Sequence, residues 1–369
     1  MPEKTGTPEG YSGLTSVERS LPTSWYRDPD HFQRELRDIW YRQWLYVDRA
    51  DTIPSPRDYR LVTIGDQSII LLRRENGTFQ AFHNTCRHRG TRLVEDRGSC
   101  RDGIVCPFHG WSYRLDGSLR GRRDGDCFDE AVSSVGLSPL PVIESAGLIW
   151  LSLDPDHDFA GALPMPDEFI TSLADLSIDN YQLLQRRPLA ADANWKLVTE
   201  LSLESYHFST LHRDSVATFL RGNAVVDTFA NGSRWAFPFA DITRLADLDE
   251  SAWPDELQGS CTFTVAPGVM LIVNASGVQM IRAEPGRDPG QCTVNYVGVA
   301  PADTDLEEAR AAFDFGGEVF CNEDLPAAES IQRNLHAGGA PLTFGRNEPL
   351  LQFWHRLWDE MLEGAGPAQ

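Results

Sequence analysis

The chain has 369 residues, and its ten tryptophans and 41% hydrophobic content are those of a globular protein with one large or two ordinary cores. A formal net charge of −21 disfavours nucleic acids and anionic membrane surfaces, so we expect neither as a partner. No apolar run approaches the length that spans a bilayer, and the first 15 residues do not resemble an export signal, so we expect a cytoplasmic protein.

The first predicted element is a helix from Ser24 to Asp48. Its apolar residues recur mainly at intervals of three and four, which is the period of an amphipathic helix. Asp28 or Asp30 is placed to cap its N-terminus. The apolar positions are Trp25, Phe32, Leu36, Ile39, Trp40, Trp44 and Leu45. We expect this segment to lie on the outside of a domain that begins near residue 45.

Residues 45 to about 155 predict a small all-β domain. Asn76-Gly77 and Asp116-Gly117 are dipeptides typical of tight hairpin turns. Strand-like runs lie at Leu61–Ile64, Ser68–Leu72, Phe79–Phe82 and Leu148–Leu153. Residues 154–165 contain turn-forming aspartates, a glycine and two prolines, which predict a linker to a second domain.

Two short cysteine–histidine motifs lie within this β domain. Cys86-x-His88 and Cys106-x-x-His109 are separated by 17 residues. Thiolates together with imidazoles bind either zinc or an iron–sulfur cluster. In a Rieske [2Fe–2S] centre, two thiolates bind one iron and two imidazoles bind the other. Each motif here supplies one cysteine and one histidine, which fits such a centre. The alternative is a structural zinc site. Without an export signal, we expect the remaining five cysteines to be thiols.

A second group of metal-binding residue types follows an Asn-Trp-Lys run at residues 194–196. Glu204, His207 and His212 lie within nine residues. On an α-helix Glu204 and His207 share a face, whereas His207 and His212 diverge by about 140°. For both imidazoles to bind one ion, the helix has to end or contain a π-bulge between them, so we predict a bent helix with one metal beside it. The alternative is that each histidine satisfies a separate hydrogen bond at a helix end.

The rest of the chain predicts strands followed by two helical stretches. The strand-like runs are Thr228–Phe239, Cys261–Val273, Val278–Arg282 and Thr293–Val299. The helical patterns are Asp305–His336, with an interruption, and Glu348–Leu362. The pattern as a whole indicates an α+β protein, in which a small all-β domain precedes a domain of strands and helices.

With these motifs the chain resembles the catalytic α subunits of Rieske non-haem iron oxygenases, a superfamily of ring-hydroxylating and betaine- or carnitine-type enzymes. It resembles the oxygenase and ferredoxin branch of Rieske proteins, since the places of the disulfide in the cytochrome-complex branch correspond to Thr91 and Phe108. The resemblance covers almost the whole chain. It implies an N-terminal helical segment packed on the catalytic domain (1–44), a Rieske domain (45–155) and a catalytic domain of the helix-grip, START/SRPBCC-like fold with an antiparallel sheet and helices (156–369).

The resemblance also implies two metal centres. The [2Fe–2S] ligands would be Cys86, His88, Cys106 and His109, and the ligands of a mononuclear Fe(II) would be His207, His212 and Asp324. Asp324 belongs to an Asp-x4-Glu-x2-Gln pattern completed by Glu329 and Gln332. The alternative is that Asp324 only caps a helix start and that Glu323 or another acid coordinates the iron.

Glu204 would occupy the place of a carboxylate that bridges a cluster histidine of one subunit to an iron histidine of its neighbour. The family pattern more often has Asp there, and the longer side chain suggests a branch that acts on small or cationic substrates. Asn194 joins Glu204 among the expected catalytic residues. Expected pocket candidates, most of them also suited to a core, are Phe208, Phe219, Trp235, Phe237, Phe239, Phe263, Met270 and Met280.

The implied activity is that of a terminal oxygenase in a head-to-tail homotrimer. A reductase, with or without a ferredoxin, would deliver electrons from NAD(P)H, and O2 would serve to hydroxylate or oxidatively demethylate a small aromatic or quaternary-ammonium substrate. Three alternatives remain from the sequence: an aromatic-ring cis-dihydroxylating dioxygenase, a Rieske electron carrier, and a zinc-stabilised binding module.

Overall fold

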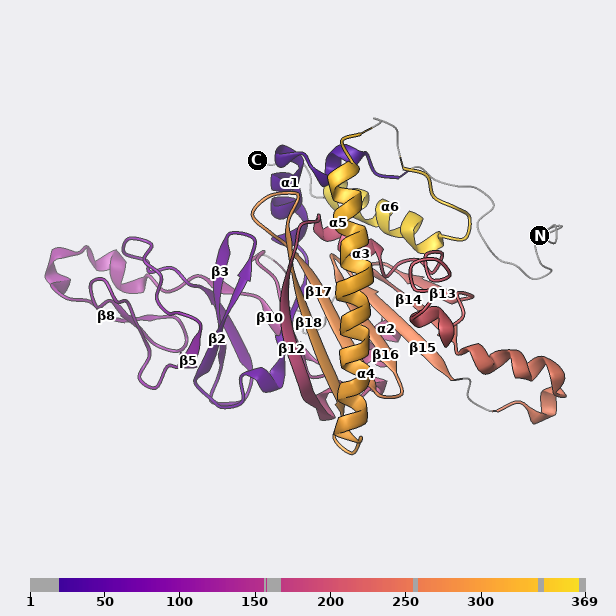
Figure 1. Ribbon diagram of the computed structural model, residues 1–369. Helices are drawn as coiled ribbons and strands as arrows, with labels where there is room; N and C mark the ends of the chain where they lie inside the picture. Colours follow the sequence, from indigo (N-terminus) through magenta and orange to yellow (C-terminus); the bar gives the residue numbers. More distant parts are fainter. Residues whose placement is uncertain (1–19, 156, 158–166, 255–257, 338–341, 365–369) are drawn as a thin grey trace.

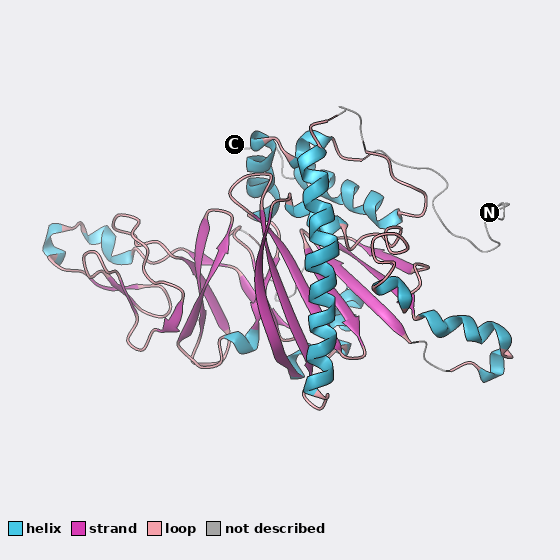
Figure 2. Cartoon of the chain, viewed as in Figure 1, coloured by secondary structure: helices cyan, strands magenta, loops and turns pink. Residues whose placement is uncertain are grey.

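The computed structural model describes residues 20–155, 157, 167–254, 258–337 and 342–364. Two parts lie side by side in Figure 1: a β-rich part in indigo to magenta, and a large sheet with helices in red to yellow. Figure 2 shows that most of the long helices gather on the second part. Within the described ranges, none of the helices is both long and apolar enough to cross a membrane.

The segment before the first strand is helical but shorter than predicted. It comprises η1 (Thr23–Tyr26), α1 (Pro29–Glu35) and the π-helical η2 (Leu36–Trp40). Asp28 caps α1, as predicted, by accepting hydrogen bonds from two backbone N–H groups of the first turn. The predicted helix is wrong beyond Trp40. Leu45–Arg49 instead forms strand β1, which is buried at every position because it pairs with Leu148–Leu151 (β11).

Three small antiparallel sheets make up the β-rich part, which confirms the all-β prediction. Their strand orders are β1-β11-β10, β5-β2-β3-β4-β9 and β6-β7-β8. The glycines of both predicted hairpin turns have positive φ, +86° at Gly77 and +84° at Gly117. The remaining elements are η3 (Ala50–Thr52), β2 (Asp58–Ile64), β3 (Gln67–Arg73), β4 (Phe79–His83), β5 (Arg97–Ser99), β6 (Ile104–Val105), β7 (Ser112–Tyr113), β8 (Leu119–Gly121), η4 (Gly125–Cys127), η5 (Glu130–Ser134), β9 (Pro139–Leu140) and β10 (Val142–Ser145).

A seven-stranded antiparallel sheet organises the second part, in the order β12-β18-β17-β16-β15-β14-β13. It confirms the predicted antiparallel sheet, and most of the predicted 154–165 linker lies outside the described residues. The strands are β12 (Tyr181–Ala191), β13 (Val225–Phe229), β14 (Gly232–Pro238), β15 (Gly259–Val265), β16 (Val269–Asn274), β17 (Gly277–Pro285) and β18 (Cys292–Pro301). The short helices are α2 (Asp167–Asp175), η6 (Ile178–Asn180), α3 (Trp195–Glu200), η7 (Val216–Thr218), η8 (Ala240–Asp247) and η9 (Glu250–Ala252).

One long continuous helical segment, drawn in orange in Figure 1, lies across this sheet. It consists of α4 (Leu306–Val319), the π-helical η10 (Phe320–Asp324) and α5 (Leu325–Asn334). The predicted interruption is therefore a π-helical turn and not a break. α4 packs on β12 and β18. The final helix, α6 (Pro349–Gly364), confirms the last predicted element.

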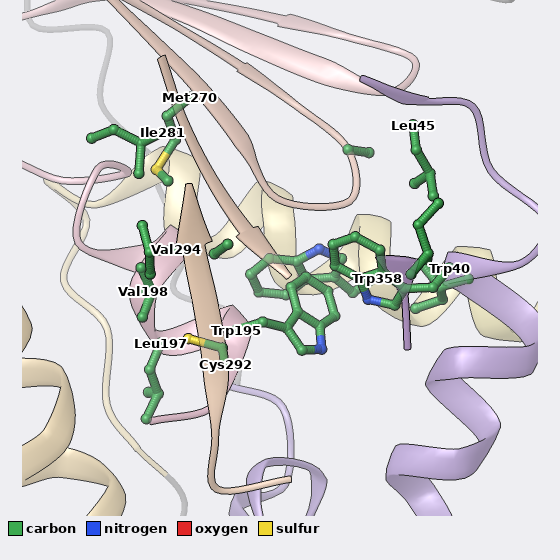
Figure 3. Close-up of a cluster of buried hydrophobic side chains, with 14 of the residues drawn as sticks. Trp40, Leu45, Trp195, Leu197, Val198, Met270, Ile281, Cys292, Val294 and Trp358 are labelled. Atoms are coloured by element: carbon green, nitrogen blue, oxygen red, sulfur yellow. The ribbon is translucent and has the colours of Figure 1, made fainter. Parts of the chain in front are cut away.

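Trp195 lies at the centre of the core that joins these elements (Figure 3). Its ring packs edge-on against Trp40 from the N-terminal segment and Trp358 from α6, with centroid distances of 5.2 and 5.3 Å. All three side chains are almost completely buried. Leu197 and Val198 of α3 belong to the same buried cluster as Ile281 and Val294 of the sheet, which Figure 3 also labels. The packing fixes α3, and hence the start of the histidine-bearing segment that follows it.

A buried ion pair also attaches the N-terminal segment to α3. Lys196 Nζ contacts a carboxylate oxygen of Glu35, and both side chains are almost inaccessible to solvent. Trp195 Nε1 donates to the other oxygen of Glu35 at 3.2 Å. Because each charge is paired and hydrogen-bonded, the pair is compatible with burial. The residues before β1 therefore pack on α3 and α6.

Candidate functional site

The two cysteine–histidine motifs form loops with the same backbone hydrogen bonds. In each loop the cysteine N–H donates to a carbonyl five residues on, that of Thr91 at 2.9 Å or that of Trp111 at 2.7 Å. The glycine four residues after the cysteine donates back to the cysteine carbonyl, at 2.9 Å for Gly90 and 3.1 Å for Gly110. Both glycines have positive φ, +74° and +71°, which residues with a Cβ rarely adopt. Each motif is thus a closed loop that fixes the direction of its cysteine and histidine.

The loops bring the four predicted cluster residues to one end of the β-rich part. Cys86 and Cys106 are each 2% exposed and belong to one buried cluster of side chains. His88 and His109 lie nearer the surface, with their Nδ1 atoms 3.1 Å apart. None of the seven cysteines forms a disulfide, as predicted. Two buried thiols beneath two outer imidazoles are the donor set of a Rieske centre, and the residues therefore fit a [2Fe–2S] cluster.

Tyr113 is a residue of this site that the sequence reasoning missed. Its hydroxyl oxygen accepts the N–H of Arg87 at 3.0 Å, so its own proton is free to be donated to Cys86 Sγ, 3.3 Å away. Burial raises the pKa of Tyr113 well above its usual value, which keeps the hydroxyl protonated. Hydrogen bonds to the sulfurs are one of the protein's means of setting a cluster's potential.

The second predicted donor set also converges. One ligand-type atom each of His207, His212 and Asp324 lies within 4.8 Å of the others. Asp324 Oδ1 is 3.1 Å from His212 Nε2 and 3.8 Å from His207 Nε2. Two imidazole nitrogens and one carboxylate oxygen are the donors of a facial triad, so the residues fit a mononuclear iron.

Two further carboxylates hold the outer nitrogens of these imidazoles. Glu204 accepts a hydrogen bond from His207 Nδ1, and Glu323 Oε2 lies 2.8 Å from His212 Nδ1. Each imidazole is thereby held with Nε2 toward the other ligand-type atoms. Burial lowers the pKa of His212, but the carboxylates of Asp324 and Glu323 outweigh it and leave that pKa raised. Glu323 therefore binds the side of the ring opposite to the one that faces Asp324.

The helical segment that follows Asp324, α5, is held by hydrogen bonds to the residues just before α3. Gln332 Oε1 accepts the N–H of Asn194 at 3.0 Å, and Glu329 Oε1 accepts the N–H of Asp192 at 3.2 Å. Asp324 directly precedes α5 with helical φ and ψ, and its side chain makes no capping hydrogen bond, so this geometry gives no support to the alternative of a mere helix cap. In the Asp-x4-Glu-x2-Gln pattern, the aspartate faces the histidines and the other two residues align its helix with them.

The prediction of a bent helix bearing both histidines is wrong. Helix α3 ends at Glu200, before either histidine, and residues 201–215 form irregular turns. The N–H groups of Thr210 and Leu211 both donate to the His207 carbonyl, at 3.0 and 2.7 Å. On these turns the His207 and His212 rings lie 4.8 Å apart, at 71° to each other. Turns allow a convergence that five-residue spacing on a helix forbids.

Asn194 does not reach the triad. It is fully buried, and its Oδ1 accepts the N–H of Lys196 at 3.0 Å, which makes it the N-cap of α3. Its Nδ2 donates to the carbonyl of Pro289 at 2.8 Å. The contacts are those of a residue that positions α3, and the expectation of a catalytic contact has no support in this geometry.

A cavity of about 330 Å³ opens beside the triad. Of the eight expected pocket candidates, Phe208, Phe219, Trp235, Phe237 and Phe239 line it, whereas Phe263, Met270 and Met280 are buried in the core. His207, His212 and Asp324 lie on its wall. The triad therefore faces a mainly apolar cavity with several aromatic side chains, of the size in which proteins bind small organic molecules.

Comparisons with known families match both parts of the chain. Residues 43–132 match the Rieske [2Fe–2S] domain. Residues 178–364 match the ring-hydroxylating α subunit (catalytic domain).

Individual relatives agree with these matches. The glycine betaine monooxygenase oxygenase subunit of Chromohalobacter salexigens is 38% identical over 201 residues, which cover 53% of this chain and 43% of the relative. The chain thus spans less than half the length of that protein. The carnitine monooxygenase oxygenase subunit of Escherichia coli K12 is 26% identical over 345 residues, 90% of this chain and 88% of the relative. A crystal structure of the quaternary ammonium Rieske monooxygenase CntA has the same fold, with a TM-score of 0.79, 22% identity and 96% coverage of both chains.

Proposed function

Because the chain belongs to the ring-hydroxylating α-subunit family, we propose that it is the terminal oxygenase of a Rieske non-haem iron system. It takes electrons from a reductase and uses O2 to hydroxylate or oxidatively demethylate a small substrate of aromatic or quaternary-ammonium type. The observation that carries this proposal is the presence of two metal-type donor sets in one chain, the second of which lies on the wall of a cavity. In this assignment residues 45–155 form the Rieske domain and residues 156–369 the catalytic domain.

We assign Cys86, His88, Cys106 and His109 as cluster ligands, and His207, His212 and Asp324 as iron ligands. When bound, the cluster supplies single electrons and the iron binds and activates O2. Among the chain's own residues, Tyr113 donates a hydrogen bond to the Cys86 sulfur, which favours the more negative, reduced form of the cluster.

At the mononuclear site the chain's residues orient the ligands and exclude water. Glu204 and Glu323 accept the Nδ1 protons of His207 and His212, and Ser215 Oγ donates to the same Glu323 oxygen at 2.9 Å. With both rings held, the three ligand atoms approach from one side, which leaves the remaining positions open for O2 and substrate. A substrate that packs against the aromatic side chains of the cavity would exclude water from that side. We assign Asn194 a positioning role.

Glu204 is the residue that we propose couples the two centres. Its Oε1 contacts His207 Nδ1 and its Oε2 accepts the His207 N–H at 3.1 Å, and 15% of its side chain is exposed, so it can accept a further hydrogen bond from a cluster histidine of a neighbouring protomer. Figure 1 supports transfer between protomers. The strands β5 and β8, near the cluster loops, lie at the end of the folded molecule that is remote from α3 and α5. The assembly would be a head-to-tail homotrimer served by an NAD(P)H-dependent reductase, with or without a ferredoxin. The unpaired state of all the cysteines supports a reducing, cytoplasmic location.

Metal analysis of the purified protein tests this function. We expect a red-brown protein with about three irons and about two acid-labile sulfides per chain, because a [2Fe–2S] cluster and one further iron are held. A protein with two irons and two sulfides after anaerobic reconstitution with Fe(II) would be an electron carrier. A colourless protein that holds zinc in the Cys86 and Cys106 loops would be a zinc-stabilised binding module. Either outcome would contradict the oxygenase assignment.

A further inference from the structure

The cavity beside the triad contains almost no charge. Among the described residues that line it, the only carboxylate is that of Asp324 and no lysine or arginine is present. Glu204 and Glu323 lie just behind the two histidines, so an iron held by the triad would be the only cation on the described lining. A carboxylate of a substrate would find no lysine or arginine on this lining, and would have to compete with O2 for the iron to gain a cationic partner.

One wall of the cavity is a row of four side chains across the sheet. Trp235 on β14 is opposite Thr262 on β15, Thr262 is opposite Ile272 on β16, and Ile272 is opposite Gln279 on β17. All four line the cavity. Residues directly opposite one another on neighbouring strands share a face of the sheet, so Gln279 presents a carboxamide at the end of an otherwise mainly apolar row.

The carboxamide of Gln279 is held in one orientation. Tyr296 Oη donates to Gln279 Oε1 at 2.6 Å. Tyr296 is itself locked, because it is 1% exposed and its ring stacks on Phe320 at 5.7 Å and 11°. In the described part of the chain, no acceptor bonds to Gln279 Nε2. Its amide protons are therefore available to a molecule in the cavity.

Helix α4 leaves space for this carboxamide. A Cβ on Gly316 would lie 2.6 Å from both Oε1 and Nε2 of Gln279. Glycine is unfavourable in a helix interior, so its presence here needs a packing reason, and Gln279 supplies one. Tyr296 on β18 fixes the orientation of the Gln279 carboxamide, and Gly316 on α4 leaves room for it. Gln279 is therefore a pre-oriented hydrogen-bond donor on the cavity wall.

We propose that Gln279 is the polar anchor of the substrate, and that the substrate is an uncharged, ring-sized molecule with one oxygen acceptor, such as an aryl ether. This inference rests on the proposed function, since it concerns the same cavity. The aromatic side chains Phe208, Trp235 and Phe237 enclose the ring, and Nε2 of Gln279 donates to the oxygen. A betaine-type zwitterion fits poorly because its carboxylate finds no lysine or arginine on the described lining. A trimethylammonium group offers no acceptor to the amide.

Calorimetric titration of the oxidised, metal-loaded protein, without reductant, tests the inference independently of turnover. The ligands are a matched set on one ring, namely methoxybenzene, ethylbenzene, benzoate and phenyltrimethylammonium, with glycine betaine and choline in addition. We expect methoxybenzene to bind about tenfold more tightly than ethylbenzene, because it alone of these two accepts a hydrogen bond. We expect each charged ligand to bind at least about tenfold more weakly than methoxybenzene.

Two variants assign the preference to the carboxamide. Gln279→Leu should reduce the affinity for methoxybenzene to that for ethylbenzene and leave ethylbenzene binding unchanged. Gln291→Leu, at an exposed glutamine in the turn between β17 and β18, should change neither affinity. If any charged ligand binds as tightly as methoxybenzene, or if Gln279→Leu keeps the tenfold preference, the inference is wrong.

The same preparation separates this inference from the proposed function. Three irons per chain with tighter binding of glycine betaine would contradict only the substrate class. Two irons per chain with a Gln279-dependent preference for methoxybenzene would contradict only the oxygenase assignment. Circular dichroism of each variant shows whether a loss of binding reflects a loss of fold.

Discussion

Replacing Asp324 with alanine should remove the mononuclear iron and abolish turnover while the visible spectrum of the [2Fe–2S] cluster stays unchanged. Asp324 is the only one of the three triad members that supplies a carboxylate oxygen, and it faces the Nε2 atoms of both histidines. Without it, two neutral imidazoles remain for a divalent ion. The cluster residues lie in a different part of the fold and keep their loops. His207→Ala should have the same outcome, and iron analysis with visible spectroscopy measures both effects.

The adjacent acid provides a matched comparison. Glu323 binds Nδ1 of His212, on the other side of the ring, so Glu323→Gln should keep the iron but lower its affinity about 10- to 100-fold. An iron titration of the two variants distinguishes a ligand from an orienting residue. If the Glu323 variant loses the iron and the Asp324 variant keeps it, the third ligand has been misassigned.

Replacing Glu204 with glutamine should leave both metal centres in place and stop electrons from passing between them. The substitution preserves the volume of the side chain but removes its charge and one of its two acceptor oxygens. Glu204 contacts His207 from outside the triad, so the iron keeps all its ligands. We expect product formation to fall about 100-fold.

Stopped-flow spectroscopy measures this step directly. A reduced cluster mixed with substrate and O2 should reoxidise quickly in the parent protein and very slowly in the Glu204→Gln variant. Glu204→Asp, which restores the residue more common in the resembled family, should recover a large part of the rate because it keeps the carboxylate. Normal product formation by the glutamine variant would rule out Glu204 as the coupling residue.

Local patterns in the sequence predict much of the fold, the four cluster ligands and the two iron histidines. Hairpin glycines and strand periodicity depend on neighbouring residues. The strands on either side of Gly77 lie where they were predicted, and the predicted turn glycine Gly117 has positive φ. The cysteine–histidine loops are closed by hydrogen bonds within six residues, which is why their spacing alone indicates a cluster. Asp324 was identified by resemblance, and its place beside the histidines depends on contacts between α5 and the segment before α3.

The predictions that were wrong or missing concern features that depend on contacts beyond the local sequence pattern. The helical period of residues 24–48 continues into β1, but pairing with β11 outweighs helix propensity there. Glu204 and His207 suggested a helix by their spacing, whereas α3 ends earlier at Glu200. The roles of Tyr113, Glu323 and Gln279 follow from partners 17 to 111 residues away in the chain.

The most direct measurement of electron transfer between protomers uses hybrid oligomers. Asp324→Ala chains retain the cluster and lack the mononuclear iron, and Cys86→Ser chains retain that iron and lack a working cluster. Each homo-oligomer should be inactive, whereas hybrids isolated through two different tags should form product, since an intact cluster then faces an intact iron in the next protomer. Hybrids that contain both metal centres and remain inactive would contradict transfer across the subunit boundary.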